Sequence, residues 1–271
     1  MRNHILMLYI YGTVYNNETR IEQSIESLNK INTEKKFLIV DNFSTDRTYE
    51  ILLKLANKYP IEVKQAKSTR GSGRNIAMNM AFDESNDNDL FMVFDLDTIY
   101  LEPFIKLAEK YIKTLQRNEV FLSFLCYRQT NFTVPWRDLN GAEDFERMAH
   151  FISEGYKLYM EKFQYDKYLF DNEPVNFDDR EKRYAKGLNY YKRRFSQVMD
   201  IMRSLGINNI KNLTAYMKDV KVRKRFYLYG LVIYATMKIK RREIYNYSQE
   251  INLFYVRKNV EWLDLSYLNP E

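Results

Sequence analysis

Short apolar runs alternate with longer segments whose apolar residues recur at helical spacing along the first half of the chain. The apolar runs predict strands at 4–11, 37–40, 61–66, 90–94 and 120–127. The helical spacing predicts helices at 18–31, 48–59, 73–82 and 101–116. Because strand–helix alternation favours a mostly parallel sheet covered on both faces, we expect an α/β fold that binds ligands at the carboxyl ends of its strands.

The second half of the chain changes to a mainly helical pattern. Helical spacing predicts helices at 184–206, 210–220 and 222–242. The sequence therefore predicts two parts, an α/β domain over residues 1–165 and a basic, mainly helical extension over residues 166–271.

Positive charge is concentrated in this extension. The whole chain has a formal net charge of +6, yet residues 182–258 alone hold 19 Lys and Arg against 4 Asp and Glu, a net of +15. Such an excess attracts a polyanion. No recognised nucleic-acid-binding motif accompanies the charge, so nucleic acid is not expected. The apolar run at 226–237 lies between basic clusters, which favours either an interfacial helix on an anionic membrane or a buried core helix with solvated ends.

Cysteine content and hydropathy bear on the location of the protein. The single cysteine, Cys126, excludes an intrachain disulfide and fits a reducing compartment. No apolar run reaches the roughly 18 residues that span a bilayer, and the first residues lack a secretory signal pattern. We therefore expect a cytoplasmic protein, with peripheral contact at the cytoplasmic membrane face as an open alternative.

The strand predicted at 90–94 ends in two carboxylates, Asp95 and Asp97. Side chains two residues apart in an extended chain face the same side, so both can approach one ligand. Such a pair suits Mg²⁺ or Mn²⁺, which keep their other positions for water and phosphate oxygens. A simpler explanation of the two carboxylates is that they cap the next helix. The FDLDT run also fits haloacid-dehalogenase-like phosphatases, in which Asp95 is the nucleophile, but three predicted strand–helix units precede it here.

Four motifs in the predicted loops resemble those of family-2 glycosyltransferases, which have the GT-A (nucleotide-diphospho-sugar transferase) fold. They are GTVYNN at 12–17, IVDNFSTDRT at 39–48, RGSGRNIAMNMA at 70–81 and FDLDT at 94–98. The motifs occur in the family's order, at predicted strand ends and helix starts, and cover about half of the chain. The resemblance implies an enzyme that transfers a sugar from a nucleoside diphosphate sugar donor to a hydroxyl acceptor.

The resemblance also implies roles in donor binding. Thr13 and Tyr15 correspond to positions that hold the base and ribose. Asp41 and Asn42 replace two adjacent acids, the second of which contacts the base, and the Asn amide can pair with a pyrimidine edge. Arg74 corresponds to an Arg that approaches the base or diphosphate, at the start of a helix whose N-terminal amides attract an anion.

Metal and acceptor roles follow from the same resemblance. Asp95 is expected to contact the ribose or a metal-bound water, and Asp97 to ligate the metal between the phosphates. The segment DLNGAEDFERMAHF at 138–151 resembles the family's E-D motif at the acceptor side. Asp144 then corresponds to the base that takes the acceptor proton in an inverting transfer, with Glu143 in support. A helix dipole alone also favours acids in a first turn, so this motif is not sufficient by itself.

We therefore expect a metal-dependent, hexosyltransferase-like glycosyltransferase whose divalent cation is Mn²⁺ or Mg²⁺. Its acceptor is a glycan, lipid or protein hydroxyl. Two alternatives remain at this point, a Mg²⁺-dependent phosphatase and a non-catalytic protein that binds sugar nucleotides or a membrane.

Overall fold

The structure is a computed structural model of the 271-residue chain, and it describes residues 6–141, 143–172 and 258–268 together with isolated positions between 189 and 256. The helices predicted in the extension, including the apolar run at 226–237, therefore lie almost entirely outside the described residues. Among the helices that the structure describes, none is long and apolar enough to cross a membrane.

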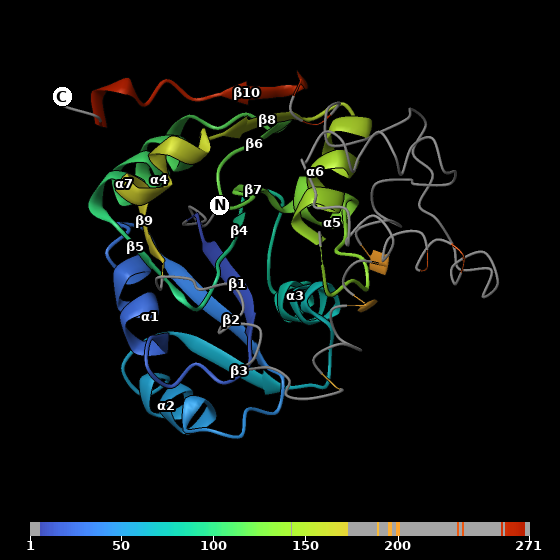
Figure 1. Cartoon of the computed structure of the whole chain (residues 1–271). Helices are drawn as coiled ribbons and strands as arrows, with labels where there is room; N and C mark the ends of the chain where they lie inside the picture. The colour runs from blue at the N-terminus through green and yellow to red at the C-terminus, as the bar shows by residue number, and fades with distance from the viewer. Residues whose placement is uncertain are drawn as a thin grey trace.

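A five-stranded sheet forms the centre of the described domain (Figure 1). In order across the sheet its strands are β3 (Ile61–Gln65), β2 (Lys35–Asp41), β1 (Leu8–Val14), β4 (Leu90–Val93) and β7 (Cys126–Tyr127). The first four pair in parallel, and β7 pairs antiparallel with β4. The mostly parallel α/β sheet expected from the sequence is confirmed.

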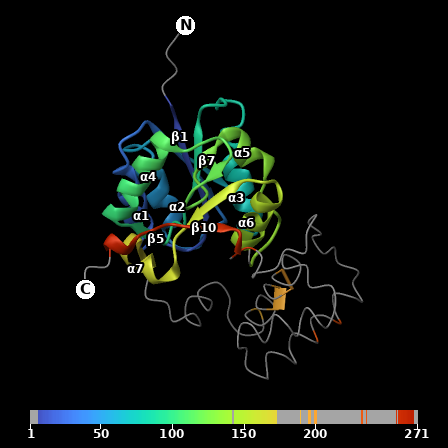
Figure 2. The same ribbon diagram turned by 90° about the horizontal axis from the view of Figure 1, so that it is seen from above.

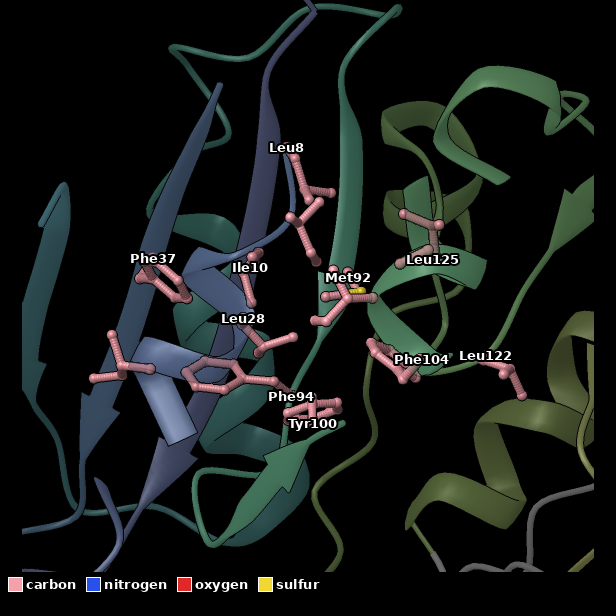
Figure 3. Close-up of a cluster of buried hydrophobic side chains, with 14 of the residues drawn as sticks. Leu8, Ile10, Leu28, Phe37, Met92, Phe94, Tyr100, Phe104, Leu122 and Leu125 are labelled. Carbon is pink, nitrogen blue, oxygen red and sulfur yellow. The ribbon is translucent and has the colours of Figure 1, made fainter. Parts of the chain in front are cut away.

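Alternation of side chains along the strands gives the sheet two apolar faces. In the first layer Leu8, Ile10 and Met92 pack around helical side chains (Figure 3). The helices on that face are α1 (Ile21–Asn29), α2 (Thr48–Leu55) and α4 (Glu102–Thr114). Tyr9 and Tyr11 point to the other face and join a second cluster. That face is covered by α3 (Arg70–Asn79), α5 (Arg128–Thr133) and α6 (Glu143–Ser153).

The apolar run at 120–127 does not form the single strand predicted from its composition. It divides between β6 (Glu119–Val120) and β7, because β7 must reverse direction to pair antiparallel with β4. The reversal places Ser123 and Phe124 in the left-handed region, at φ 56° and 53°. Most residues of the run are apolar and buried on both sides of the turn, so hydrophobicity alone did not reveal the break.

Two smaller sheets bring later segments onto this domain. One is parallel in the order β10-β8-β6, and the other pairs β5 antiparallel with β9. The remaining elements are β5 (Thr98–Tyr100), β8 (Lys157–Met160), η1 (Phe163–Tyr165), α7 (Asp166–Leu169), β9 (Phe170–Asn172), β10 (Val260–Trp262) and η2 (Ser266–Leu268). In Figure 2 the red segment with β10 runs from the α6 side of the molecule to the α7 side. Leu169 and Leu265 lie in the first core cluster, while the predicted division between residues 165 and 166 stays a prediction.

The start of α3 differs from the predicted one for a local reason. The hydroxyl of Thr69 accepts the Ser72 backbone N–H at 3.1 Å, and the Ser72 hydroxyl accepts the Thr69 N–H at 2.9 Å. This reciprocal cap starts the helix at Arg70. Arg74 consequently lies in the second turn of α3 rather than at its beginning.

Candidate active site

A pocket of about 180 Å³ lies where β1 and β4 end. Its walls are formed by Thr13, Val14, Tyr15, Asn17, Arg70, Arg74, Asp95, Leu96, Asp97 and Asp144. Six of these residues are ones that the family resemblance assigns to the donor, the metal or the acceptor. Segments far apart in the sequence therefore converge at the carboxyl edge of the sheet, where parallel sheets bind ligands.

Close packing of α3 against the end of β1 sets one wall of the pocket. The Thr13 hydroxyl donates to the Val40 carbonyl at 3.0 Å. A Cβ atom on Gly73 would lie 2.6 Å from the Thr13 Oγ1, so glycine is required at this approach. The next residue, Arg74, is thereby held over the strand end.

The turn between β4 and β5 carries the two carboxylates of the FDLDT run. The backbone N–H of Asp95 donates to the Tyr100 hydroxyl at 2.9 Å, and its carbonyl accepts the Thr98 N–H at 3.1 Å. The Asn17 amide donates to the Leu96 carbonyl at 2.6 Å. The backbone of the turn is therefore fixed, while the Asp95 side chain remains 56% exposed to a ligand.

Arg74 joins the two sides of the pocket. Its Nη2 donates to Asp95 Oδ1 at 2.6 Å, and its Nη1 contacts Asp144 and, at 3.3 Å, Glu143. The Arg74 side chain is only 5% exposed. The carboxylates assigned to the donor side and to the acceptor side therefore lie within the span of one guanidinium.

A stack of aromatic and cationic groups supports Arg74. Its guanidinium carbon lies 4.6 Å from a Trp136 ring centroid, and that of Arg147 lies 4.4 Å from the Trp136 ring. Arg147 is fully buried and donates to the Tyr11 hydroxyl and to the Asn131 side chain and carbonyl. Sequence reasoning missed this support because its members come from four segments, and spacing along the chain does not show that they meet.

The first turn of α6 supplies the candidate base. Glu143 is buried beneath Arg74, at 2% exposure, and does not line the pocket, whereas Asp144 does and is 49% exposed. The pKa of Asp144 is raised from 3.8 to about 7. Partial loss of hydration around this half-exposed carboxyl group contributes most to the increase, Arg74 opposes it, and the charges of Glu143 and Asp95 add to it. A carboxyl group that titrates near neutral pH suits proton transfer.

Two residues assigned to the donor do not line the pocket. Asp41 is fully buried at the end of β2, where its carboxylate accepts the Ser44 backbone N–H at 3.1 Å and the Gln65 amide at 2.9 Å. The Asn42 side chain donates to the Ser68 carbonyl at 3.0 Å and accepts the Ser68 N–H at 2.9 Å. Both residues shape loops in this structure, and their contacts with the donor stay predictions.

The N-terminal amides of α3 are already occupied. The N–H of Arg70 donates to Asn140 Oδ1 at 3.2 Å, and that of Gly71 donates to the Leu139 carbonyl at 3.0 Å. The expectation that this helix terminus offers amides to an anion is therefore wrong. Positive charge in the pocket comes instead from the side chains of Arg70 and Arg74, one helical turn apart. Arg70 was missed because the family resemblance assigns it no role and because the predicted helix began after it, at residue 73.

Asp95 and Asp97 are the candidate ligands for a divalent cation. Within the described part of the chain, no three His, Cys, Asp or Glu side chains group closely enough to hold a metal. Mg²⁺ is commonly bound by one or two carboxylates and takes its other ligands from substrate phosphates and water. The two carboxylates of this turn fit a cation shared with a diphosphate, and they do not fit a centre built from protein ligands alone.

Comparison with known proteins gives one family match and several structural similarities. The sequence matches the model of glycosyl transferase family 2 over residues 10–181, more than half of the chain. S. aureus TarS 1-349 in complex with UDP-GlcNAc is 17% identical with a TM-score of 0.49, over 73% of this chain and 67% of that chain. In the longer TarS structure the alignment spans 55% of that chain. The mannosyltransferase PcManGT from Pyrobaculum calidifontis, in complex with GDP-Man and Mn²⁺, is 12% identical with a TM-score of 0.48, over 89% of each chain. No curated protein matches the sequence.

Proposed function

The chain belongs to glycosyl transferase family 2 and is a glycosyltransferase, and from this premise we propose that it transfers one sugar from a nucleoside diphosphate sugar to a hydroxyl acceptor with inversion. We further propose that Mn²⁺ or Mg²⁺ assists the transfer. The observation that supports this most directly is the pocket itself. It gathers residues assigned to base, diphosphate, metal and acceptor from four separate segments.

The donor side of the proposal rests on the chemistry of the pocket walls. Thr13 and Tyr15 would hold the nucleoside, and Arg74 would approach the diphosphate. Asp97, together with Asp95, would hold the cation. A bound divalent cation would neutralise charge on the diphosphate as it leaves. Arg74 now contacts Asp95, so donor binding would require this guanidinium to divide its hydrogen bonds between protein and phosphate.

The acceptor side of the proposal rests on Asp144. Its carboxylate lines the pocket and would take the proton from the acceptor hydroxyl as that oxygen attacks the anomeric carbon. Arg74 contacts this carboxylate and thereby fixes its position. Glu143 lies buried behind the guanidinium and holds Arg74 in place from the other side.

Calorimetric titration with nucleoside diphosphates tests the proposal. We expect UDP or GDP to bind with Mn²⁺ or Mg²⁺ present and to bind at least about tenfold more weakly after chelation. Asp97→Ala should remove most of this metal dependence, because it takes away one of only two candidate ligands. Asp83→Ala, a change at an exposed carboxylate outside the pocket, should have no effect. Equal affinity of the wild type with and without metal would refute the metal role.

The family match contradicts the phosphatase alternative. Asp95 follows the fourth strand of the chain rather than the first, and the matched region begins at residue 10. Mass spectrometry after incubation with phosphate esters offers a direct check, because a phosphatase of that type would leave a phosphoaspartyl adduct on Asp95.

Membrane contact and a cytoplasmic location are further parts of the proposal. Their support is the net charge of +15 over residues 182–258 and the apolar run between basic clusters. A peripheral enzyme of this kind would meet a lipid-linked or membrane-near acceptor at the cytoplasmic face.

A further inference from the structure

Phe43 combines two unfavourable features at the carboxyl edge of the sheet. Its backbone has φ of 55°, in the left-handed region that bulky side chains rarely adopt. Its side chain is 53% exposed. Neither of the two large hydrophobic clusters among the described residues includes it. A strained backbone and an exposed ring cost stability without a folding benefit, and such outliers are often kept for a ligand.

The loop that carries Phe43 is tied to the rim of the pocket on both sides of this residue. The N–H of Asn42 donates to the Val14 carbonyl at 2.9 Å, and the Ser44 hydroxyl accepts the Asn16 N–H at 2.9 Å. The bonded segment contains Tyr15, which lines the pocket. Phe43 therefore lies on a loop fastened beside Tyr15, the residue that the resemblance assigns to the nucleoside.

The size of the pocket indicates that a donor extends beyond it. Its volume is about 180 Å³, whereas sites for ligands of this size usually have at least about 300 Å³. Charged side chains line the pocket and suit the diphosphate and cation. The base, which is the flat and least polar part of the donor, would then lie outside, towards the loops of Tyr15 and Phe43.

Edge recognition of the base by Asn42 could use only part of its amide, because one N–H donates to the Ser68 carbonyl and one lone pair of the oxygen accepts the Ser68 N–H. Stacking on an aromatic ring needs no such edge contact and accepts any base, because every base has a π-face.

We propose that Phe43 is a stacking platform for the nucleobase of the donor, held in position by its left-handed backbone. This inference rests on the proposed function and adds a base-binding residue to it. Stacking of a base on an aromatic side chain is worth about 1–3 kcal/mol, which corresponds to a change in affinity of roughly 5- to 150-fold.

The test compares Phe43→Gly with the wild type in the presence of Mn²⁺, using UDP, GDP and inorganic pyrophosphate as probes. Phe43→Gly should weaken UDP and GDP binding by roughly 5- to 150-fold and leave pyrophosphate binding unchanged, because pyrophosphate has no base. The melting temperature without ligand should stay equal or rise, since glycine adopts this φ freely. Phe43→Tyr should bind all three probes like the wild type. Phe82→Ala, at another exposed ring outside the pocket, is the matched control.

The outcomes separate this inference from the proposed function. If the wild type binds UDP or GDP and Phe43→Gly binds them equally well, the stacking role is wrong and the proposed function stands. A lower melting temperature with equal loss of all three probes would show that Phe43 only supports the fold. If the wild type binds no nucleoside diphosphate, both proposals fail.

Discussion

Among the residues of the site, Arg74 is the one whose substitution we expect to lower the free energy of unfolding most. Arg74→Met keeps most of the side-chain volume and removes the charge. Three carboxylates lose a partner, but their burial differs. Asp95 and Asp144 are 56% and 49% exposed, so water can replace the guanidinium there and each pair counts for at most about 1 kcal/mol. Glu143 is 2% exposed and cannot be rehydrated without movement of α6.

The stability lost in Arg74→Met is therefore determined mainly by the buried charge of Glu143. Removing one partner of a buried ion pair costs about 3–5 kcal/mol, because an uncompensated charge remains. Arg70 lies 3.7 Å from Glu143 and compensates part of that charge, which places the expected loss near the lower end, about 3 kcal/mol. For a chain of this size that corresponds to a drop in melting temperature of roughly 6–12 °C.

Urea denaturation of three variants beside the wild type tests this reasoning. Arg74→Met should lose about 3 kcal/mol of unfolding free energy, and adding Glu143→Gln should recover most of it, because the buried charge is then gone. Arg20→Met removes an Arg whose partner Asp171 is 55% exposed, and should cost at most about 1 kcal/mol. A loss below about 1 kcal/mol in Arg74→Met, or no recovery in the double variant, would refute the assignment of the cost to Glu143.

Three further predictions concern catalysis and the extension. Asp144→Asn should retain nucleoside diphosphate binding and lose transfer by about 10²–10⁴-fold, measured with any active acceptor. In the wild type, transfer should fall as the pH drops below about 7, since the raised pKa leaves Asp144 protonated and unable to accept a proton; an acid limb near pH 4 would contradict this. The wild type should sediment with anionic liposomes at low salt, at roughly 1 kcal/mol for each basic residue near the surface. Neutralising Lys238, Lys240, Arg241 and Arg242 should release it without changing donor binding, and failure of the wild type to sediment would refute membrane contact.

Periodicity predicted most of the fold because its signals are local. The strands β1, β2 and β4 are apolar runs, and α1 and α4 show helical spacing, so each was found within a few residues. The run at 120–127 was assigned wrongly because its turn is as apolar as the strands on either side. The start of α3 was missed because a Thr–Ser cap determined it, and apolar spacing carries no information about a cap.

In the candidate site, the sequence predicted which residues line the pocket but not which side chains they contact. Motif positions identified the pocket residues, because strand ends of a parallel sheet necessarily meet at one edge. The partners of those residues were not predictable from spacing. Arg74 bonds carboxylates 21 and 70 residues away, and the Asn42 amide is used by a loop 26 residues away. The sequence suggested a base contact for Asn42, which stays a prediction, and the structure adds that the same amide joins two loops.

The balance of charges around the pocket explains why a divalent cation would be favourable there. Asp95, Asp97 and Asp144 line the pocket and Glu143 lies behind it, while Arg70 and Arg74 are its cations. With every carboxylate ionised, four negative charges face two positive ones, and a single divalent cation would make the two sums equal. A nucleoside diphosphate sugar brings two further negative charges, so its phosphates would compete with Asp95 and Asp144 for Arg74. Protonation of Asp144, whose pKa is raised to about 7, removes one negative charge and weakens that competition. Donor binding should therefore tolerate mildly acidic pH better than transfer does, because only transfer requires the deprotonated Asp144.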